Sequence, residues 1–203
     1  MKEYCHFICS NGAVICDGDG NILELQSMPR EEAIQIAYDF WNRTDGRGEV
    51  NLASAAACHL MSRDLGMEER LKFIGNKYYL IQEPEQVEEE IVKVSVYLPD
   101  GAANYVDRFL EKWKQYNPAI AGPYWIDTTL ANKGTGVERL AKRLNLQPDE
   151  IMAFGDNYND VSMLDYVGHP YIMESATEEL RNRYANHTTC VEDTIDEFLS
   201  KYK

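Results

Sequence analysis

The chain has 203 residues, of which 34 are acidic and 20 are basic, so its formal net charge is −14. Hydrophobic residues make up 44% and charged residues 27%, a composition typical of a globular protein rather than a disordered one. The negative charge disfavours sequence-independent nucleic-acid binding, which needs a basic face, and also docking on an anionic membrane. No apolar run approaches the roughly 20 residues of a membrane-spanning helix, and the first residues lack the pattern of a signal peptide.

The five cysteines indicate reduced thiols rather than a disulfide framework, because their number is odd and their spacing does not repeat. Cys5 and Cys9 flank His6, but no second ligand pair exists to complete a zinc site. A reducing, cytoplasmic location is therefore expected.

Short strands and tight turns are predicted at the start of the chain. Strand-like segments cover residues 4–9, 13–16 and 22–25. They are separated by the turn signals Ser10-Asn11-Gly12 and Asp17-Gly18-Asp19-Gly20-Asn21, so an antiparallel hairpin is expected.

The middle of the chain has weaker patterning. Helices are predicted after Pro29 and over residues 63–74, 83–90 and 102–116. Strands are predicted over 50–60, 92–98 and around 120–126.

The second half alternates clearly between helix and strand. Helices are predicted over 134–144, from 161 and over 177–184, with short apolar strands at 151–154 and 171–173. This alternation predicts βαβ units with a parallel sheet that is buried on both faces.

The loop that follows the strand 151–154 carries two aspartates and two asparagines within residues 155–160. Ligands of open α/β sheets bind at this carboxyl end, and clustered oxygen donors suit Mg²⁺. Lys133 stands at a helix start, where the helix dipole disfavours a cation unless an anion such as phosphate is bound nearby. Taken singly, Lys133 could be an ordinary exposed lysine and Asp156 an ordinary helix-capping residue. Their joint spacing is what favours a ligand-binding site.

These segments resemble a known family. Asn132-Lys133-Gly134-Thr135-Gly136-Val137, Ile151 to Asp160 and the following Met163-Leu164 are similar to motifs III and IV of the haloacid-dehalogenase superfamily. They look most like the Cof-like phosphatases of subclass IIB. The hairpin from Phe7 to Ile22 also resembles that family, so the likeness extends along the whole chain, with its specific motifs in residues 131–168.

The resemblance implies an α/β fold with a Rossmann-like parallel-sheet core, N-terminally incomplete, and an inserted α/β cap domain. The core would comprise residues 1–27 and 126–203, and the cap residues 28–125.

The resemblance also implies residue roles. Asp156 would bind Mg²⁺, and Lys133 would neutralise the substrate phosphate and a phospho-aspartyl intermediate. Asp160 would orient Lys133 or take part in the metal site. Asn159 and Asn11 would contact phosphate or substrate.

The nucleophile motif of the family, D-x-D-G-T, precedes the hairpin that here begins within ten residues of Met1, so the first two family motifs are expected to be missing. Asp17-Gly18-Asp19-Gly20-Asn21 resembles that motif and leaves two interpretations open. It is either a hairpin turn, or it supplies Asp17 as nucleophile and Asp19 as general acid/base. A calcium loop is disfavoured because Ile22 and Met28 occupy its glycine and glutamate positions.

Without a preceding strand, the strand 151–154 would have an unpaired edge. The chain is therefore expected to be a fragment, to be complemented by an N-terminal polypeptide, or to form a homodimer.

The leading functional hypothesis is a Mg²⁺-dependent phosphatase that acts on a small, sugar-phosphate-like metabolite through an aspartyl phosphate and is impaired by the missing motif. The alternative is a non-catalytic fragment, pseudo-phosphatase or half of a split enzyme that binds phosphate and Mg²⁺ without turnover. An unrelated small-molecule-binding domain is a third reading, which requires the motif matches to be coincidence.

Overall fold

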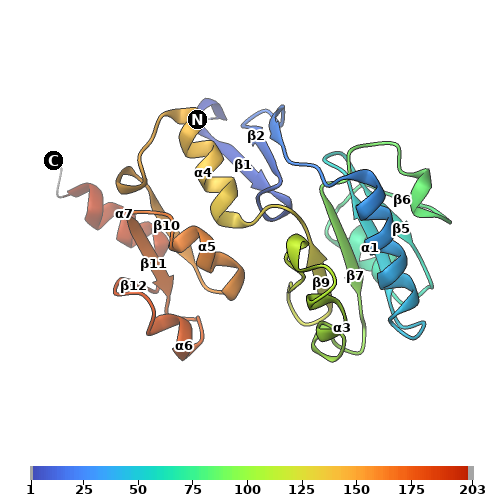
Figure 1. Ribbon diagram of the computed structural model, residues 1–203. Helices are drawn as coiled ribbons and strands as arrows, with labels where there is room; N and C mark the ends of the chain where they lie inside the picture. Colours follow the sequence, from blue (N-terminus) through green and yellow to red (C-terminus); the bar gives the residue numbers. More distant parts are fainter. Residues whose placement is uncertain (1, 201–203) are drawn as a thin grey trace. The chain divides into compact units, whose positions relative to one another are not determined.

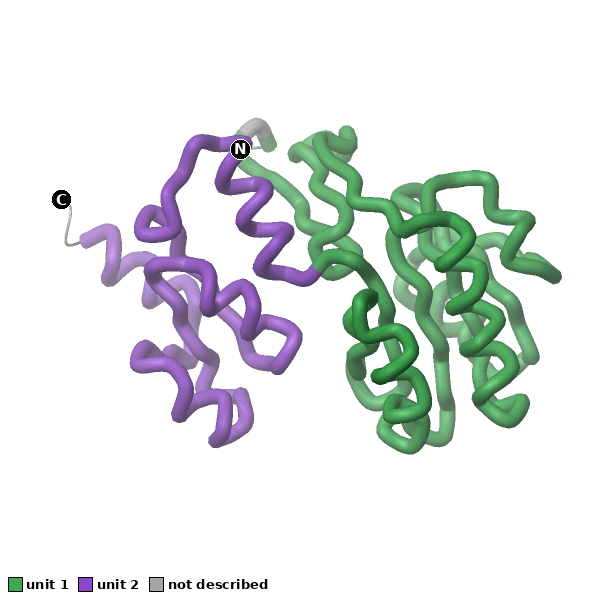
Figure 2. Tube along the Cα trace, in the orientation of Figure 1, with its two compact units in different colours: residues 1–131 green, residues 132–203 purple. Residues whose placement is uncertain are grey.

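The structure is a computed structural model that describes residues 2–200 (Figure 1). The chain divides into two compact units, residues 1–131 (unit 1) and residues 132–203 (unit 2), shown in two colours in Figure 2. In the described residues unit 1 contains two sheets and unit 2 contains one, and each unit has its own hydrophobic core. The expected α/β class is confirmed. Between residues 2 and 200, no helix combines the length and the apolar character needed to cross a bilayer.

Unit 1 begins with a three-stranded antiparallel sheet, as the turn signals predict. Its strands are β1 (His6–Cys9), β2 (Val14–Asp17) and β3 (Ile22–Leu25). The turn between β1 and β2 has three successive residues with positive φ: Ser10 at 50°, Asn11 at 55° and Gly12 at 100°. Asparagine and glycine tolerate this region of backbone space, which is why this turn signal works.

The larger part of unit 1 is a six-stranded sheet with the order β6-β5-β4-β7-β9-β8. All neighbours are antiparallel except β5 and β6. The strands are β4 (Glu49–Ala53), β5 (Cys58–Met61), β6 (Tyr78–Leu80), β7 (Lys93–Tyr97), β8 (Ala119–Ile120) and β9 (Trp125–Thr128).

One face of this sheet is covered by α1 (Arg30–Asn42) and α3 (Asp107–Leu110), which lie on the same side of it in Figure 1. Their contact includes an edge-to-face pair of Phe40 and Phe109, whose ring centroids are 4.7 Å apart. The opposite face packs in part against α2 (Met67–Phe73) through a smaller apolar cluster. The turn between β1 and β2 contacts the same face through Asn11 and Asp127, and part of the remaining face lines a cavity.

Two predicted helices of the middle region are wrong. Residues 83–90 form only a 3₁₀ turn at Pro84–Gln86, because the Arg30 side chain donates to the backbone carbonyls of Glu85 and Val87. A helix would need those carbonyls for its own ladder.

The continuous helix expected over 102–116 is also wrong. It is broken into the turns Ala102–Asn104 and Lys114–Tyr116 around the short α3. Tyr105, Phe109 and Trp113, whose spacing predicts the helix, are nevertheless buried, so the core packing follows the pattern while the backbone does not.

The single strand expected over 50–60 is two strands, β4 and β5, joined by a turn. The Ser54 hydroxyl accepts hydrogen bonds from the backbone N–H groups of Ala56 and Ala57 and stabilises that turn.

Unit 2 is a three-stranded parallel sheet with the order β10-β11-β12 and helices between its strands. The alternation of helix and strand is confirmed, whereas β12 and the last helix were not expected. Its elements are α4 (Lys133–Leu144), β10 (Met152–Gly155), α5 (Val161–Leu164), β11 (His169–Met173), α6 (Glu178–Arg181), β12 (His187–Thr188) and α7 (Val191–Ser200).

Candidate functional site

The polar loop of unit 2 follows β10 directly and is organised around the carboxylate of Asp160. One oxygen of this carboxylate accepts the backbone N–H groups of Asp156 and Asn157, at 3.0 and 3.1 Å. The Asp160 side chain is buried, whereas residues 156–159 are exposed. The buried carboxylate therefore fixes the loop from within and leaves its other side chains at the surface.

The other oxygen of Asp160 contacts the ammonium group of Lys133, the first residue of α4. Asn132 caps this helix: its side chain accepts the N–H of Thr135 at 2.9 Å, and the Thr135 hydroxyl accepts the N–H of Asn132 at 3.0 Å. A cation in the first helical turn is unfavourable by itself, and the Asp160 carboxylate offsets that cost. The Lys133 side chain is 35% exposed, so it is held in place and still accessible to an anion.

Two glycines allow this close packing. A Cβ on Gly155 would lie 2.6 Å from the Cβ of Asp160, and a Cβ on Gly134 would lie 2.2 Å from the carbonyl oxygen of Ser162. The Gly134 N–H donates to the Ser162 hydroxyl at 3.1 Å. The start of α4 can therefore approach the loop this closely only because residues 134 and 155 have no side chains.

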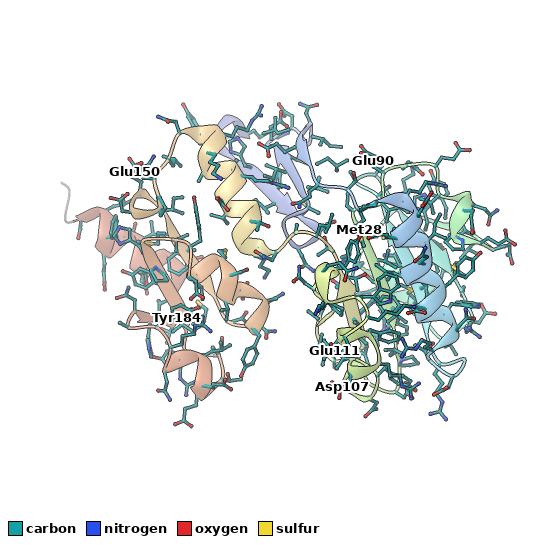
Figure 3. The ribbon with its side chains drawn as sticks, viewed as in Figure 1. Met28, Glu90, Asp107, Glu111, Glu150 and Tyr184 are labelled. Atoms are coloured by element: carbon teal, nitrogen blue, oxygen red, sulfur yellow. The ribbon has the colours of Figure 1, made fainter. Side chains whose placement is uncertain are left out.

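Tyr184, labelled in Figure 3, forms hydrogen bonds with residues at both ends of α5, the helix that follows the loop. The Tyr184 hydroxyl donates to Asp165 at 2.9 Å. Burial, together with this hydrogen bond to a carboxylate, raises the pKa of Tyr184 to about 12. The neutral phenol is thus a structural part of unit 2.

The donor chemistry of the loop fits Mg²⁺. Asp156 offers an exposed carboxylate and Asn159 an exposed amide at the carboxyl end of β10. Within residues 2–200, no group of three or more His, Cys, Asp or Glu side chains is placed to hold a metal ion. Mg²⁺ does not need such a cage, because it usually keeps several waters and takes one or two protein carboxylates.

The structure brings four of the predicted site residues together in unit 2, namely Lys133, Asp156, Asn159 and Asp160. The other three, Asn11, Asp17 and Asp19, belong to unit 1.

Asp17 ends β2, and its carboxylate organises the turn that follows. It accepts the backbone N–H groups of Asp19 and Asn21, at 3.0 and 2.9 Å, and the side-chain amide of Asn21 at 2.9 Å. The hydrogen bond from the Asn21 side chain is the main cause that lowers the pKa of Asp17. The exposed Asp19 carboxylate lies 3.7 Å from the ammonium of Lys2. These residues form the hairpin turn, one of the two interpretations of the segment.

Asn11 belongs to a polar group that was not found from sequence. Its side-chain amide donates to Asp127 of β9 at 3.1 Å, and the ammonium of Lys93 on β7 donates to the same oxygen at 2.9 Å. Asp127 is 6% exposed. In the sequence, the one sign of this polar group is the charged residue Asp127 between Ile126 and Thr128.

Comparison with known proteins agrees with this geometry. Residues 1–196 match the family model of haloacid dehalogenase-like hydrolases. The chain belongs to this family. Membership was expected from the motifs around Lys133 and Asp156, and it is confirmed.

A curated relative of this chain is the HMP-PP phosphatase of Serratia proteamaculans (strain 568), which is 28% identical over 191 residues. The match covers 87% of this chain and 65% of the relative, so the chain spans slightly under two thirds of that protein.

Among solved structures, SMU.1108c from Streptococcus mutans UA159 has a TM-score of 0.80 and 23% identity, with 98% of this chain and 78% of that chain covered. The subclass IIB sugar phosphatase BT4131 has a TM-score of 0.79 and 17% identity, with 95% and 75% covered. At these identities the likeness shows the fold alone, which is the haloacid-dehalogenase fold.

Proposed function

We propose that this protein is a Mg²⁺-dependent phosphatase-type hydrolase that acts on a small phosphorylated metabolite through an aspartyl phosphate. The observation that carries the proposal is the Lys133 ammonium, held by the buried Asp160 beside the exposed Asp156 at the end of β10. A fixed cation next to a metal-binding carboxylate is what a transferring phosphoryl group requires.

The four residues have distinct roles in this proposal. Lys133 neutralises the phosphate, and Asp160 positions Lys133, because both Asp160 oxygens already accept hydrogen bonds inside unit 2. Asp156 is the protein ligand of Mg²⁺, and Asp160 is the second carboxylate of the metal site. Asn159 contacts phosphate or substrate. When bound, Mg²⁺ would add positive charge where negative charge accumulates on the phosphoryl oxygens.

The substrate class is supported by the names of the relatives, an HMP-PP phosphatase and a sugar phosphatase. We infer a small, sugar-phosphate-like metabolite, with residues 28–125 as the cap and residues 1–27 and 126–203 as the core. The net charge of −14 repels phosphorylated molecules at long range, so the local charge of Lys133 and the metal ion must attract them. Asn11 remains a predicted substrate contact.

Whether the chain supplies a nucleophile distinguishes this proposal from a second candidate function, which is binding of phosphate and Mg²⁺ without turnover. The D-x-D pair of the sequence is Asp17 and Asp19, and both Asp17 oxygens are engaged in turn hydrogen bonds. This observation favours impaired or absent turnover. Were Asp17 the nucleophile, Asp19 would serve as general acid/base.

A partner chain is part of the proposal. In the described residues β10 is at the edge of the unit 2 sheet, so its outer edge is open to pairing with a complementing polypeptide or a second copy. A cytoplasmic location is proposed from the free thiols.

The deciding experiment is hydrolysis of p-nitrophenyl phosphate with and without Mg²⁺, combined with binding of inorganic phosphate. We expect slow, Mg²⁺-dependent release of phosphate, because both Asp17 oxygens are engaged, and we expect Lys133→Ala to lower it about 100-fold or more. Lys142→Ala is the matched control, because Lys142 is an exposed lysine of the same helix and pairs with Glu138.

Phosphate binding without hydrolysis would favour the second candidate. Equal hydrolysis by the Lys133→Ala and Lys142→Ala variants would contradict the proposed site.

A further inference from the structure

The polar loop after β10 is tied to the rest of unit 2 at a second point, besides the contact between Lys133 and Asp160. The Tyr158 hydroxyl donates to the Glu179 carboxylate of α6 at 2.6 Å. This distance is typical of a hydrogen bond from a hydroxyl group to a charged carboxylate. The loop is therefore joined to α6 on one side and to α4 on the other.

Folding stability does not explain the contact between Tyr158 and Glu179. Tyr158 is 53% exposed and Glu179 is also exposed, and polar contacts at the surface contribute little to stability. Holding an exposed aromatic side chain in one rotamer also costs conformational entropy. The contact lies in the same loop as Asp156 and Asn159, so its consequence is expected in the geometry of the site.

Glu179 is a firm anchor because α6 is fixed to the segment that follows β11. Its neighbour Leu180 is only 2% exposed and packs in the core of unit 2. The Arg181 side chain donates to the backbone carbonyls of Glu174 and Ala176, at 3.0 and 2.6 Å. Since β10 and β11 are parallel neighbours, the end of β11 lies at the same edge of the sheet as the loop.

The segment between the two anchors is the 3₁₀ helix Tyr158–Asp160. A 3₁₀ helix has three residues per turn, so its three successive side chains point about 120° apart. The first residue, Tyr158, is bound to α6, and the third, Asp160, is bound to α4. The direction of the middle side chain, Asn159, is thereby set by its two neighbours.

Asn159 is exposed, and it is the residue of this helix that is proposed to contact phosphate or substrate. With the Asp160 contact alone, the turn could still pivot about its buried end. The Tyr158 contact removes that freedom before a ligand binds. A donor that is already oriented loses less conformational freedom on binding, so it contributes more to affinity.

We propose that Tyr158 and Glu179 are positioning residues of the phosphate site, and that their hydrogen bond aims the Asn159 amide at the phosphoryl group. Tyr158 is not a catalytic residue in this proposal, because its hydroxyl donates to Glu179. The inference rests on the proposed function, since it gives the pair a task in that same site.

The test is calorimetric titration of the full chain with inorganic phosphate in the presence of Mg²⁺. Tyr158→Phe removes only the hydroxyl and should weaken phosphate binding about 10-fold, the lower end of the effect of losing an outer hydrogen-bond partner. Glu179→Ala should weaken it equally. The double variant should bind no worse than either single variant, because both changes remove the same hydrogen bond. Glu179→Gln keeps a side-chain carbonyl as acceptor and should retain most of the affinity.

Glu178→Ala is the matched control, because Glu178 is the neighbouring exposed glutamate of α6. This variant should bind phosphate like the unmodified chain. Urea unfolding separates positioning from stability: Tyr158→Phe should unfold at the same urea concentration as the Glu178→Ala control. A Tyr158→Phe variant that unfolds at clearly lower urea concentration would show a structural role instead.

Unchanged phosphate affinity in Tyr158→Phe, or additive effects of Tyr158→Phe and Glu179→Ala, would overturn the inference. The proposed function fails by a different result, which is an unmodified chain that binds no phosphate. Amide hydrogen exchange then decides the positioning role. The Asp160 N–H, which donates to the Asn157 carbonyl at 3.0 Å, should exchange faster in Tyr158→Phe, and an unchanged rate would overturn the inference.

Discussion

The buried carboxylate of Asp160 in unit 2 accepts three hydrogen bonds, whereas the buried hydroxyl of Ser95 in unit 1 has no partner among residues 2–200. In unit 2 the buried polar group has its partners, and the neighbouring side chains of the loop are exposed. In unit 1 a buried polar group is left without a partner. The first arrangement stabilises unit 2, and the second lowers the stability of unit 1.

The largest effect is expected from Asp160→Ala. It leaves the Lys133 ammonium and two backbone N–H groups without their partner, so the free energy of unfolding of unit 2 should fall by about 3 kcal/mol. Urea unfolding followed by amide signals of unit 2 measures this change. Asp156→Ala, an exposed aspartate of the same loop, is the control and should change it by less than about 0.5 kcal/mol. Equal effects of the two substitutions would show that Asp160 is not the organising group.

Asp127→Ala is the corresponding change in unit 1. It removes the acceptor of Lys93 and Asn11 and should destabilise unit 1 by about 2 kcal/mol, less than in unit 2 because it frees no backbone N–H group. Asp107→Ala, an exposed aspartate labelled in Figure 3, should be close to neutral in the same measurement. A larger loss for Asp127→Ala than for Asp160→Ala would reverse the comparison.

Gly134→Ala tests the tight packing of α4 in unit 2. Alanine normally stabilises a helix by about 1 kcal/mol relative to glycine. Here its Cβ would lie 2.2 Å from the Ser162 carbonyl oxygen, so we expect a net loss of about 1–2 kcal/mol. Chemical unfolding gives the sign, and Lys142→Ala on the exposed side of α4 is the reference. A stabilised Gly134→Ala variant would mean that α4 does not need this close approach.

Ser95→Ala should act in the opposite direction. Removing a buried hydroxyl without a partner is expected to leave the stability of unit 1 unchanged or to raise it by up to about 1 kcal/mol. The change is measured by thermal unfolding, with Ser200→Ala, which changes an exposed serine of α7, as control. A clear loss of stability would show that the Ser95 hydroxyl is satisfied in the empty protein.

Tyr184 gives the smallest effect, a pH dependence. Its pKa is raised from 10.0 to about 12 in the folded chain, so the folded state favours the neutral phenol. This contribution to stability is fully present below pH 10.0 and is lost as pH rises toward about 12. A spectrophotometric titration should show one late-ionising tyrosine fewer in the Tyr184→Phe variant than in the unmodified chain. Loss of a tyrosine that ionises in the ordinary range instead would contradict the prediction.

The two regions also differ in how far they could be predicted from the sequence. Lys133, Asp156 and Asp160 occur in two short segments whose spacing indicates their chemistry, and a short loop after a strand needs little tertiary information. The structure added what that spacing could not reveal, namely that Asp160 is saturated while Asp156 is exposed.

The row of polar residues Asn51, Ser95 and Asp127 in unit 1 was not predicted, because these residues are brought together only by strand register. Each lies in a short strand, and nothing in the sequence indicates which residue of another strand it will face. The same dependence on tertiary contacts explains the wrong helix over 83–90, where one arginine from α1 takes two backbone carbonyls. Helix–strand alternation in unit 2 was predicted well because parallel βαβ units are local in sequence.

The hydrogen bond between Asn11 and Asp127 joins residues that are 116 positions apart in the chain. It stabilises a turn whose residues Ser10 and Asn11 adopt left-handed backbone angles, a conformation that residues other than glycine rarely adopt. Asp127 reaches its place only when β9 has paired with β7, so closing this contact requires ordering nearly the whole of unit 1. The turn between β1 and β2 is therefore expected to acquire its final geometry late in folding, although its two strands are close together in the sequence.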